Sequence, residues 1–385
     1  MKIFFFIRSL EVGGSQRQLA TTAAGLARRG HEVAVIVLYP GGGTEPLLHN
    51  TGVRLIALGK TGRWDVIGPF KRLRRLLASE TPDVLYSFLP TQNTLAALAL
   101  PKESATRLVF GLRGTTADHA KYDAVSRFMC VAEARLSRRA DLVVANGDSV
   151  KADAVSRGLP EGRTIVIPNG IDTEAMKPNA AARQALRRAW GLDPNHFVIG
   201  MVARLDPMKD HRTFLAAARL FALKNQDARF VCVGAGPERQ QYSEELFALS
   251  RSLGMSERIV WAGDGIGAAD AYNAFDVATL SSAFGEGFPN VIGEAMACGV
   301  PVAATDVGDS RAVVGTWGEI VPPQSPGELC VAWGRLRMKL KDDGPALAAS
   351  IRSHIASNFS VDLLLDRTET ALTRLTRGFS APPQS

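Results

Sequence analysis

The chain has 385 residues, of which 46% are hydrophobic and 22% are charged, and its formal net charge is +7. This length exceeds one ordinary hydrophobic core and indicates two domains, and the composition is typical of a globular protein rather than a disordered one. No apolar run approaches the ~20 residues of a membrane-spanning helix. The positive charge favours anionic partners such as nucleotides or phospholipid. Nucleic acid is the least favoured of these, because no aromatic side chains alternate with the basic ones.

The cysteines and the N-terminal stretch bear on the compartment in which the protein works. The cysteines are widely spaced, and the spacing matches neither a zinc site nor a disulfide framework. Residues 2–7 are too short for the apolar core of a signal peptide and are better explained as a first strand. We therefore expect a cytoplasmic protein with four buried, unpaired thiols, namely Cys130, Cys232, Cys298 and Cys330.

Strand-like and helix-like segments alternate along the first half of the chain. The expected strands are residues 2–7, 31–38, 53–58, 84–87, 107–112, 141–145 and 164–167. Helices are expected between them at residues 16–29, with Ser15 as the cap, and at 66–78, 91–100, 124–139 and 149–157. This alternation predicts an α/β fold with a doubly wound parallel sheet and right-handed crossovers.

Turn-forming residues 168–172, with Asn169 and Gly170 at their centre, mark a boundary between two domains. We expect a first domain at residues 1–172, a second at 173–360 and a short tail at 378–385. The second domain repeats the design, with strands expected at residues 197–203, 229–233, 259–262, 277–280, 300–304 and 319–321. Its helices are expected at residues 179–190, 211–224, 238–253, 268–275, 289–298, 326–341 and 345–358, and one more follows at 361–377.

The most informative stretch is residues 281–309, which reads as a loop, a helix and a short strand. Pro289 suits the first turn of a helix, and Gly299 suits its end. Two carboxylates, Glu286 and Glu294, flank the helix start, whose free backbone N–H groups favour an anion. Carboxylates accept hydrogen bonds from paired hydroxyls, and N–H groups bind a phosphate. A nucleotide sugar offers both, because its diphosphate lies between a sugar and a ribose. The alternative is a solvent-facing helix end with two ordinary surface acids.

Two cations follow an expected strand of the second domain, Arg204 and Lys209. A departing nucleoside diphosphate develops negative charge, which must be met by a metal ion or by fixed cations. The chain contains no Asp-x-Asp motif of the kind that holds a metal in metal-dependent sugar transferases. We therefore expect these two side chains to take that role, with no metal and no other cofactor. The alternative is that both are ordinary surface charges of a loop.

The sequence EGFPNVIGEAMACGVPVAATDVGD, from Glu286 to Asp309, resembles the donor-binding segment of glycosyltransferase family 4, whose members are retaining, two-domain enzymes of the GT-B fold. The resemblance covers nearly the whole chain and is sharp at residues 13–14, 169–172, 204–209 and 286–308. It implies two Rossmann-like domains that face a cleft, with the acceptor on the first and the nucleotide sugar on the second. It also implies that the helix at 361–377 crosses back to the first domain.

The same resemblance assigns roles to individual residues. It implies that Glu294 binds the ribose hydroxyls and that Glu286 binds hydroxyls of the donor sugar, beside the diphosphate cations Arg204 and Lys209. Further donor contacts are implied for Gly14, Gly234, Gly287, Phe288, Pro289 and Asn290, the last four mainly through their backbone. As local patterns alone, the glycine-containing loops also fit plain tight turns.

The chain departs from the family pattern in the first domain. Many members place a histidine directly after the strand that ends here at Leu112, where this chain has Arg113. Arg113 could contact a phosphate or an anionic acceptor, and His119, six positions later, could also reach the acceptor. A lone histidine in a loop is more often structural or solvated, so both readings of His119 stay open.

The function that these features imply is retaining transfer of a sugar from a nucleoside-diphosphate sugar to a hydroxyl acceptor, in the synthesis of a glycan, polysaccharide or glycolipid. A nucleotide-sugar epimerase of the same fold and a non-catalytic nucleotide-sugar binding protein are the alternatives. A dinucleotide-dependent oxidoreductase is disfavoured, because the Gly-x-Gly-x-x-Gly fingerprint is missing after the first strand.

Two basic helical stretches of the first domain, residues 71–77 and 127–139, suggest a further partner. Amphipathic cationic helices dock on anionic lipid, which would place the protein at the inner face of a membrane with a lipid-linked acceptor. The alternative is that both are solvated helix faces.

Overall fold

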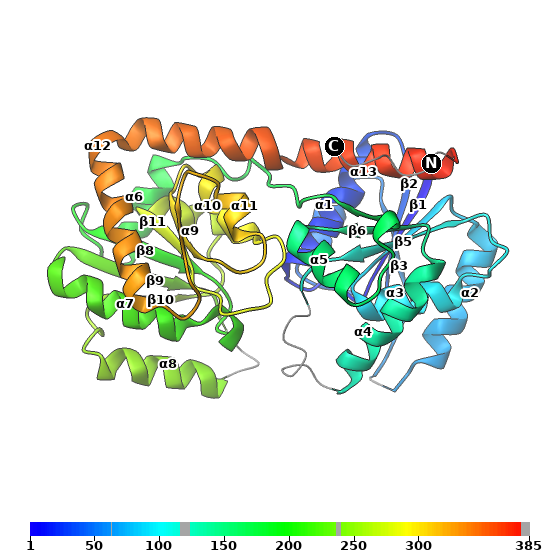
Figure 1. Ribbon diagram of the computed structural model, residues 1–385, viewed down its shortest axis with the longest axis horizontal. Helices are drawn as coiled ribbons and strands as arrows, with labels where there is room; N and C mark the ends of the chain where they lie inside the picture. Colours follow the sequence, from blue (N-terminus) through cyan, green and yellow to red (C-terminus); the bar gives the residue numbers. More distant parts are fainter. Residues whose placement is uncertain (63, 116–123, 236–239, 379–385) are drawn as a thin grey trace. The chain divides into compact units, whose positions relative to one another are not determined.

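The computed structural model describes residues 1–62, 64–115, 124–235 and 240–378. The chain divides into two compact units, the first from Met1 to Gly170 together with the segment from Val361 onward, and the second from Ile171 to Ser360. Each unit is built on its own parallel sheet with helices on both faces (Figure 1). The predicted fold class, α/β with two Rossmann-like doubly wound sheets, is confirmed. The boundary lies at Gly170, two residues before the expected one.

The sheet of the first unit has seven strands in the order β3-β2-β1-β4-β5-β6-β7. The strand order reverses between β1 and β4, which is the position where doubly wound sheets bind ligands at their carboxyl edge. The central strands read as continuous apolar runs because both of their faces are covered. The strands are β1 (Lys2–Ile7), β2 (Glu32–Val37), β3 (Arg54–Ala57), β4 (Val84–Phe88), β5 (Arg107–Leu112), β6 (Leu142–Ala145) and β7 (Thr164–Val166).

Helices cover both faces of this first sheet. One face packs on α1 (Gly14–Arg28) and α13 (Val361–Thr376), through a core that includes Phe5, Leu19 and Leu365. The opposite face is covered by α2 (Ile67–Glu80), α3 (Pro90–Ala99), α4 (Ala124–Leu136) and α5 (Asp148–Ser156). Short 3₁₀ turns η1 (Glu45–Leu48), η3 (Ser137–Arg139) and η4 (Glu161–Arg163) complete the described helices of the unit.

The C-terminal helix α13 packs on the first unit, although it follows the second unit in the chain. A Cβ atom on Gly25 of α1 would lie 2.5 Å from Leu365 Cδ1, so the absence of a side chain lets the two helices approach closely. At the end of the contact Glu369 accepts from Arg29 Nη1 at 2.9 Å, and its other oxygen lies 2.9 Å from His31 Nε2.

The sheet of the second unit has six strands in the order β10-β9-β8-β11-β12-β13. They are β8 (Phe197–Val202), β9 (Ala228–Val233), β10 (Ile259–Gly263), β11 (Val277–Leu280), β12 (Val302–Thr305) and β13 (Glu319–Val321). The described helices are α6 (Ala180–Ala189), η5 (Pro207–Lys209), α7 (His211–Lys224), α8 (Gln240–Ser252), α9 (Ala268–Ala274), α10 (Asn290–Ala297), α11 (Ser310–Val314) and α12 (Pro326–Phe359). Two apolar clusters, one on each face of the sheet, form the core.

Helix ends account for most differences from the expected elements. The start expected for α1 was wrong, because α1 begins at Gly14 after an extended Gly13, and Ser15 lies inside the helix rather than capping it. Helix α10 begins at Asn290, so Pro289 is its cap rather than its first residue. Strand β12 begins at Val302 because the Val300 amide instead donates to Ala295 O at 3.0 Å, closing the end of α10.

The two helices expected before residue 360 form one element with a break. Asp343 has non-helical φ and ψ of −155° and 48°, and it is followed by Gly344 and Pro345, both poor residues for a helix interior. The four cysteines are unpaired, three of them buried and Cys330 half-buried. Within the described ranges, no helix combines the length and the apolar character needed to cross a membrane.

Candidate functional site

Four loops at the carboxyl edge of the second sheet are tied together by hydrogen bonds. They follow β8, β9, β11 and β12, and they carry the residues expected to bind a nucleotide sugar. Ser281 Oγ donates to Lys209 O at 2.9 Å, and the Ala283 amide donates to Met208 O at 2.9 Å, so the loop after β11 is fixed on the loop after β8. The Asp309 amide donates to Gly287 O at 3.0 Å and joins the loop after β12 to the same group.

Lys209 and Glu286 form the charged centre of these loops. Lys209 Nζ lies 2.6 Å from Glu286 Oε1, and the same oxygen accepts from Ser282 Oγ at 2.6 Å. The Glu286 residue is only 7% exposed, so the pair is largely shielded from water. Charge-assisted hydrogen bonds of this length are among the stronger ones in proteins, and they fix both side chains at the edge of the sheet.

The local fold after β8 aims Lys209 at this centre. The Asp206 carboxylate accepts from the Met208 amide at 2.9 Å and begins the turn η5, with Pro207 at its first position. Asp210 then adopts a left-handed conformation with φ of 48°, which a non-glycine residue rarely does, and ends the turn. Its carboxylate caps α7 by accepting from the Thr213 amide at 3.1 Å. The sharp turn places the side chain of Lys209 against the loop after β11.

Arg204, the second expected cation, lies on the same loop in a different environment. Its side chain is exposed, directly after the end of β8, and among the described residues it makes no ion pair. Lys209 is therefore held by its carboxylate partner, whereas the Arg204 side chain extends into solvent.

The second carboxylate, Glu294, belongs to α10 and is 4% exposed. Tyr272 on α9 donates its hydroxyl to Glu294 Oε2 at 3.3 Å. Burial of both Glu286 and Glu294 contradicts the alternative that they are ordinary surface acids. Charged groups are seldom buried without a structural or ligand-binding reason, because their desolvation is costly.

Glycines allow the loops around these acids to approach each other. A Cβ atom on Gly308, whose φ is +60°, would lie 2.5 Å from Gly287 O. A Cβ atom on Gly234, whose φ is +130°, would lie 2.2 Å from Ala203 O. Both positions exclude a side chain, so they are required for the packing of the loops whether or not a ligand is bound. The following residues 236–239 lie outside the described residues.

The other residues expected to contact the nucleotide sugar could do so mainly through their backbone atoms. The Phe288 ring is buried against Phe359, with ring centroids 5.3 Å apart, so this side chain belongs to the core. Pro289 has no N–H group, which leaves Gly287 and Asn290 to offer amides near the start of α10. The expected roles of these residues and of Gly14, the first residue of α1, stay predictions.

Arg113 lies at the carboxyl edge of the first sheet, directly after β5. Its guanidinium stacks 3.9 Å from the centroid of the Phe88 ring, Nη2 donates to the Tyr86 hydroxyl at 3.1 Å, and Nη1 donates to Asn169 Oδ1 at 3.2 Å. The other acceptor candidate, His119, lies outside the described residues.

Ser282 and Tyr272 were not expected from the sequence. Ser282 lies four residues before Glu286 in an irregular loop, where no periodicity indicates a contact. Tyr272 lies 22 residues before Glu294 and meets it only in the folded unit. Lys209 and Glu286 were both expected in the donor site, and the structure brings their side chains together, although the ion pair itself was not expected.

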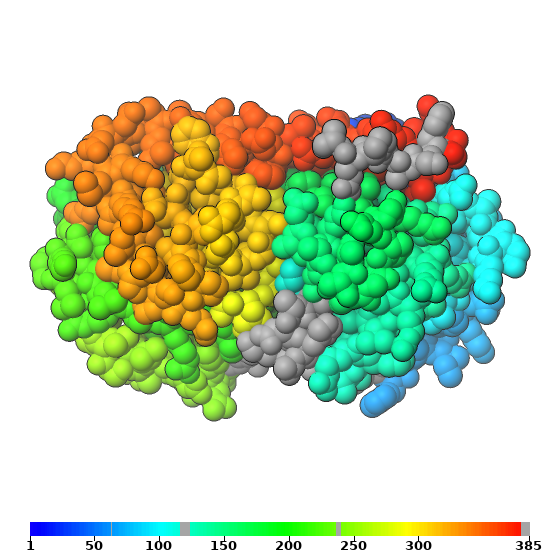
Figure 2. Space-filling model, viewed as in Figure 1, coloured from blue at the N-terminus to red at the C-terminus, as the bar shows by residue number. Residues whose placement is uncertain are grey.

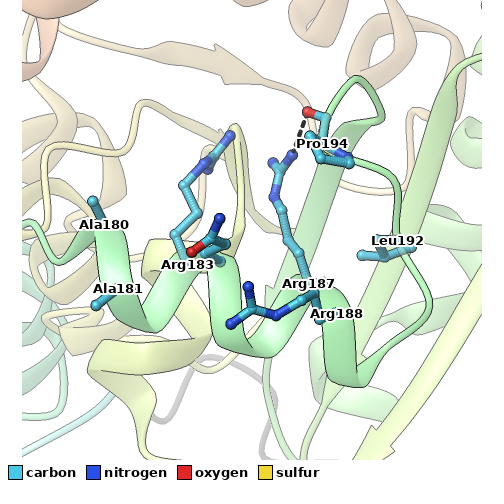
Figure 3. A pocket seen from close by; sticks show the side chains of 8 residues that line it. Ala180, Ala181, Arg183, Arg187, Arg188, Leu192 and Pro194 are labelled. Carbon is cyan, nitrogen blue, oxygen red and sulfur yellow. Dashed lines mark hydrogen bonds between the residues drawn. The ribbon is translucent and has the colours of Figure 1, made fainter.

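A hollow of about 470 Å³ lies along α6, lined by Ala180, Ala181, Arg183, Gln184, Arg187, Arg188, Leu192 and Pro194 (Figure 3). Two of its arginines, Arg183 and Arg187, bind opposite oxygens of Asp276 at 2.5 and 2.8 Å. Arg187 also donates to backbone carbonyls, including that of Ala274 at 2.9 Å. These arginines hold α6 on the sheet, and none of the candidate donor residues lines the hollow. Within the described ranges, no three histidine, cysteine or acidic side chains gather as a metal site requires.

Two family models match the chain. The model described as Glycosyltransferase Family 4 matches residues 12–175, and the model described as Glycosyl transferases group 1 matches residues 196–337. Together they include both the unit that carries Arg113 and the loops around Lys209 and Glu286.

Curated relatives carry the same family character. D-inositol 3-phosphate glycosyltransferase 2 of Catenulispora acidiphila is 32% identical over 52% of this chain and 49% of the relative. The D-inositol 3-phosphate glycosyltransferase of Actinosynnema mirum is 27% identical over 90% of this chain and 87% of the relative. The match thus spans about half the length of the first relative and most of the second.

Solved structures share the fold. The Anabaena protein HepE in complex with UDP-glucose has a TM-score of 0.83 and 22% identity, over 97% of this chain and 99% of that chain. Sucrose-phosphate synthase from Thermosynechococcus elongatus has a TM-score of 0.84 and 20% identity, over 98% of this chain and 99% of that chain. At these identities the likeness establishes the fold, which is GT-B. The two family models and the curated relatives show that the chain belongs to glycosyltransferase family 4.

Proposed function

We propose that the protein is a retaining glycosyltransferase that moves a sugar from a nucleoside-diphosphate sugar to a hydroxyl acceptor. The observation that carries the proposal is the pair of buried carboxylates, Glu286 and Glu294, at the start of α10, with Lys209 held 2.6 Å from the first. This arrangement offers acceptors for hydroxyls on both sides of a cation and of the backbone at the helix start. A nucleotide sugar presents hydroxyls on both sides of a diphosphate.

The residues suggest how the leaving group would be stabilised. As the bond between the anomeric carbon and the phosphate oxygen breaks, its electron pair stays on the diphosphate, and Lys209 and Arg204 would meet the new charge. The ammonium group of Lys209 has three donors, so it can keep Glu286 while it also binds a phosphate oxygen. The acceptor hydroxyl would attack from the face that the diphosphate leaves, and its proton would pass to the leaving phosphate oxygen. No metal is required in this scheme, because fixed cations replace it.

Glu286 would position the sugar rather than attack it. Its Oε1 already accepts from both Lys209 and Ser282, which lowers its electron density and fixes its orientation. Glu294 would bind the ribose hydroxyls, with Tyr272 orienting the carboxylate. The names of the relatives support a sugar transferred to a hydroxyl-rich acceptor, and the UDP-glucose complex of HepE supports a uridine nucleotide as the first donor to test.

We also propose that the first unit contacts an anionic membrane that carries the acceptor. Exposed apolar side chains accompany the basic ones, with Trp64 87% and Ile67 72% exposed at the start of α2 and Phe128 63% exposed on α4. Helix α3 contacts both α2 and α4, so all three lie in one layer, and the surfaces of α2 and α4 are visible in Figure 2. Exposed aromatic and apolar side chains beside cations are typical of interfacial helices.

Not every basic residue of these helices is available to lipid. Arg72 donates through Nε to Leu58 O at 2.6 Å, and Arg139 donates to Leu100 O at 2.7 Å, so both fix the fold. The proposed surface therefore consists of Trp64, Val66, Ile67, Lys71, Arg74 and Arg75 from the α2 region, with Val125, Arg127, Phe128 and Val131 from α4.

A panel of nucleotide sugars, tested by thermal unfolding in the presence of EDTA, examines the donor proposal directly. A donor present at 100 times its dissociation constant stabilises the folded protein by about 2.7 kcal/mol, which raises the unfolding temperature by a few degrees. Sugar transfer or hydrolysis by the stabilised mixture separates an enzyme from a binding protein, and a changed sugar on the recovered nucleotide identifies an epimerase. Stabilisation by no member of the panel, or activity that EDTA abolishes and manganese restores, would contradict the proposal.

A further inference from the structure

Arg113 is half-buried, and its partners differ from those of two other described arginines that expose little surface, Arg157 and Arg187. Arg157 pairs with Glu133 at 3.1 Å and with Asp153 at 3.0 Å, and Arg187 pairs with Asp276 at 2.8 Å. Arg113 contacts only neutral groups among the described residues, namely the Tyr86 hydroxyl, the Asn169 amide oxygen and the face of the Phe88 ring. Within the described part of the chain, its Nε has no hydrogen-bond partner.

Within the described ranges, no carboxylate balances the positive charge of Arg113. Burial lowers the pKa of the guanidinium, and the contact with the Tyr86 hydroxyl only partly opposes that effect. The group stays protonated, because arginine does not lose its proton in proteins. A shielded cation with neutral partners is costly, and an anion that binds beside it recovers the lost interaction.

The position of Arg113 is fixed before any ligand arrives. Gly111 has no side chain, and a Cβ atom there would lie 2.9 Å from Phe88 Cδ1 and 3.1 Å from Tyr86 Cε2. The rings of Phe88 and Tyr86 can therefore lie over Gly111 of β5, where the guanidinium of Arg113 contacts both residues. Asn169 is held from the other side, since Gln18 of α1 exchanges hydrogen bonds of 2.8 and 3.0 Å with its neighbour Gly170.

A second polar side chain lies next to Arg113 on the sheet edge. Leu112 pairs with Ala145 in the parallel register of β5 and β6, and the Asn146 amide donates to Leu112 O at 3.2 Å. Because side chains alternate between the faces of a sheet, Arg113 and Asn146 both point to the face that α1 covers. Asn146 is 2% exposed, and its Oδ1 has no partner within the described residues.

We propose that Arg113 and Asn146 form an acceptor subsite that binds an anionic group, phosphate or carboxylate, next to a hydroxyl. The planar guanidinium would bind two oxygens of the anion through Nε and a free Nη hydrogen, and Asn146 would accept from the neighbouring hydroxyl. The inference rests on the proposed function in one respect, which is that the first unit receives the acceptor. It adds a selection for negatively charged acceptors over neutral ones.

The test measures binding of matched neutral and anionic probes by calorimetry, with saturating UDP present to occupy the donor loops. The probes are myo-inositol against myo-inositol 3-phosphate, and glucose against glucuronate. We expect wild-type protein to bind at least one anionic probe about 10-fold or more tightly than its neutral counterpart, the size expected for hydrogen bonds to a charged group. Phosphate selectivity and carboxylate selectivity are read from the two pairs separately.

Variants assign the preference to the subsite. Arg113→Gln should bring anionic and neutral probes to similar affinity, Arg113→Lys should keep part of the preference, and Asn146→Ala should weaken both members of a pair alike. Arg8→Gln, another arginine that follows a strand of the same sheet edge, serves as the control and should leave the preference unchanged. Unfolding temperatures confirm that each variant is folded.

Equal binding of neutral and anionic probes to the wild type, no binding of either anionic probe, or a preference that survives Arg113→Gln would overturn the inference. These outcomes leave the proposed function intact as long as UDP binds. Failure of UDP to bind the wild type would instead contradict the proposed function.

Discussion

Glu286 and Glu294 are carboxylates that the fold keeps away from water, and each has a neutral or positive donor within hydrogen-bond reach. The loops around Glu286 are also joined by their own amides and by Ser281. Buried charged groups beside specific partners are candidates for binding or catalysis. The two acids are therefore the residues at which substitution tests the site most clearly.

Replacement of Glu294 should weaken nucleotide binding and leave folding intact. Glu294→Ala removes the proposed acceptor of the ribose hydroxyls, so we expect UDP affinity to fall by about 1.5–3 kcal/mol, or roughly 10- to 150-fold. Calorimetry measures the change, with Glu328→Ala, an exposed acid of the same unit, as the matched control. Unchanged UDP affinity in a folded Glu294→Ala protein would show that this acid does not bind the nucleotide.

His211 makes stability depend on pH. Burial, with a smaller contribution from nearby Lys209, lowers its pKa from 6.5 to about 4, and Asp206 acts in the opposite direction. In the unfolded chain the imidazole takes up a proton below about pH 6.5, whereas in the folded protein it does so only near pH 4. The contribution is therefore complete above pH 6.5 and is lost as the pH falls towards 4, by up to about 3 kcal/mol.

Urea unfolding at pH 7.5 and pH 4.5 measures this contribution. The free energy of unfolding should fall less for His211→Gln than for the wild type over that interval, by about 2–3 kcal/mol. His49→Gln, at an exposed position, should behave as the wild type does. Parallel losses in wild type and His211→Gln would refute the assignment.

At the scale of elements, the strands were the part of the fold that the sequence predicted best. Each strand of the two sheets coincides with an expected apolar run, because parallel strands covered on both faces need such runs. Helix starts were less predictable. Gly13 and Pro289 act as caps without any side-chain hydrogen bond, so the usual Ser, Thr, Asp or Asn signal is missing there.

The residues of the candidate site were also predictable only in part. Glu286, Glu294 and Lys209 lie in continuous motifs, so the local sequence identifies them. The local sequence does not identify the side chains that contact them. Tyr272, for example, belongs to another helix than Glu294. The setting of Arg113 depends on Tyr86 and Asn169, which are 27 and 56 residues away in the chain. Contacts of this kind are set by tertiary packing, which a single sequence does not display.

Helices α2 and α4 carry the prediction about the membrane. Each basic residue near an anionic surface contributes about 1 kcal/mol, so Arg74→Glu with Arg75→Glu should weaken binding to phosphatidylserine-containing vesicles at least roughly 10-fold. Sedimentation with vesicles measures binding, and raised salt should weaken it for the wild type. Lys341→Glu, an exposed basic residue of the second unit, is the control. Wild-type binding that is absent, or that resists the double reversal, would count against the membrane surface.

The whole molecule combines two Rossmann-like units, and the second, which we propose to bind the donor, carries Lys209 and Arg204 together with the buried acids Glu286 and Glu294. An inverting transferase needs a general base on the acceptor side, opposite the leaving group. The residue that follows β5 on the first unit is Arg113, which cannot act as a base. Among the described residues, the groups that could assist the reaction are those proposed to surround the leaving diphosphate, and for this reason we propose retention of configuration at the anomeric carbon.

The most direct test of this account is the anomeric configuration of the first product formed from UDP-α-glucose, or from the donor that the panel identifies, with myo-inositol 3-phosphate offered as acceptor. NMR spectra recorded during the first turnovers, with EDTA present, report the configuration before any exchange. Retention predicts an α-linked product from the wild type, and stabilisation of the leaving group by cations predicts no product from Lys209→Ala or Arg204→Ala. A β-linked product would contradict it.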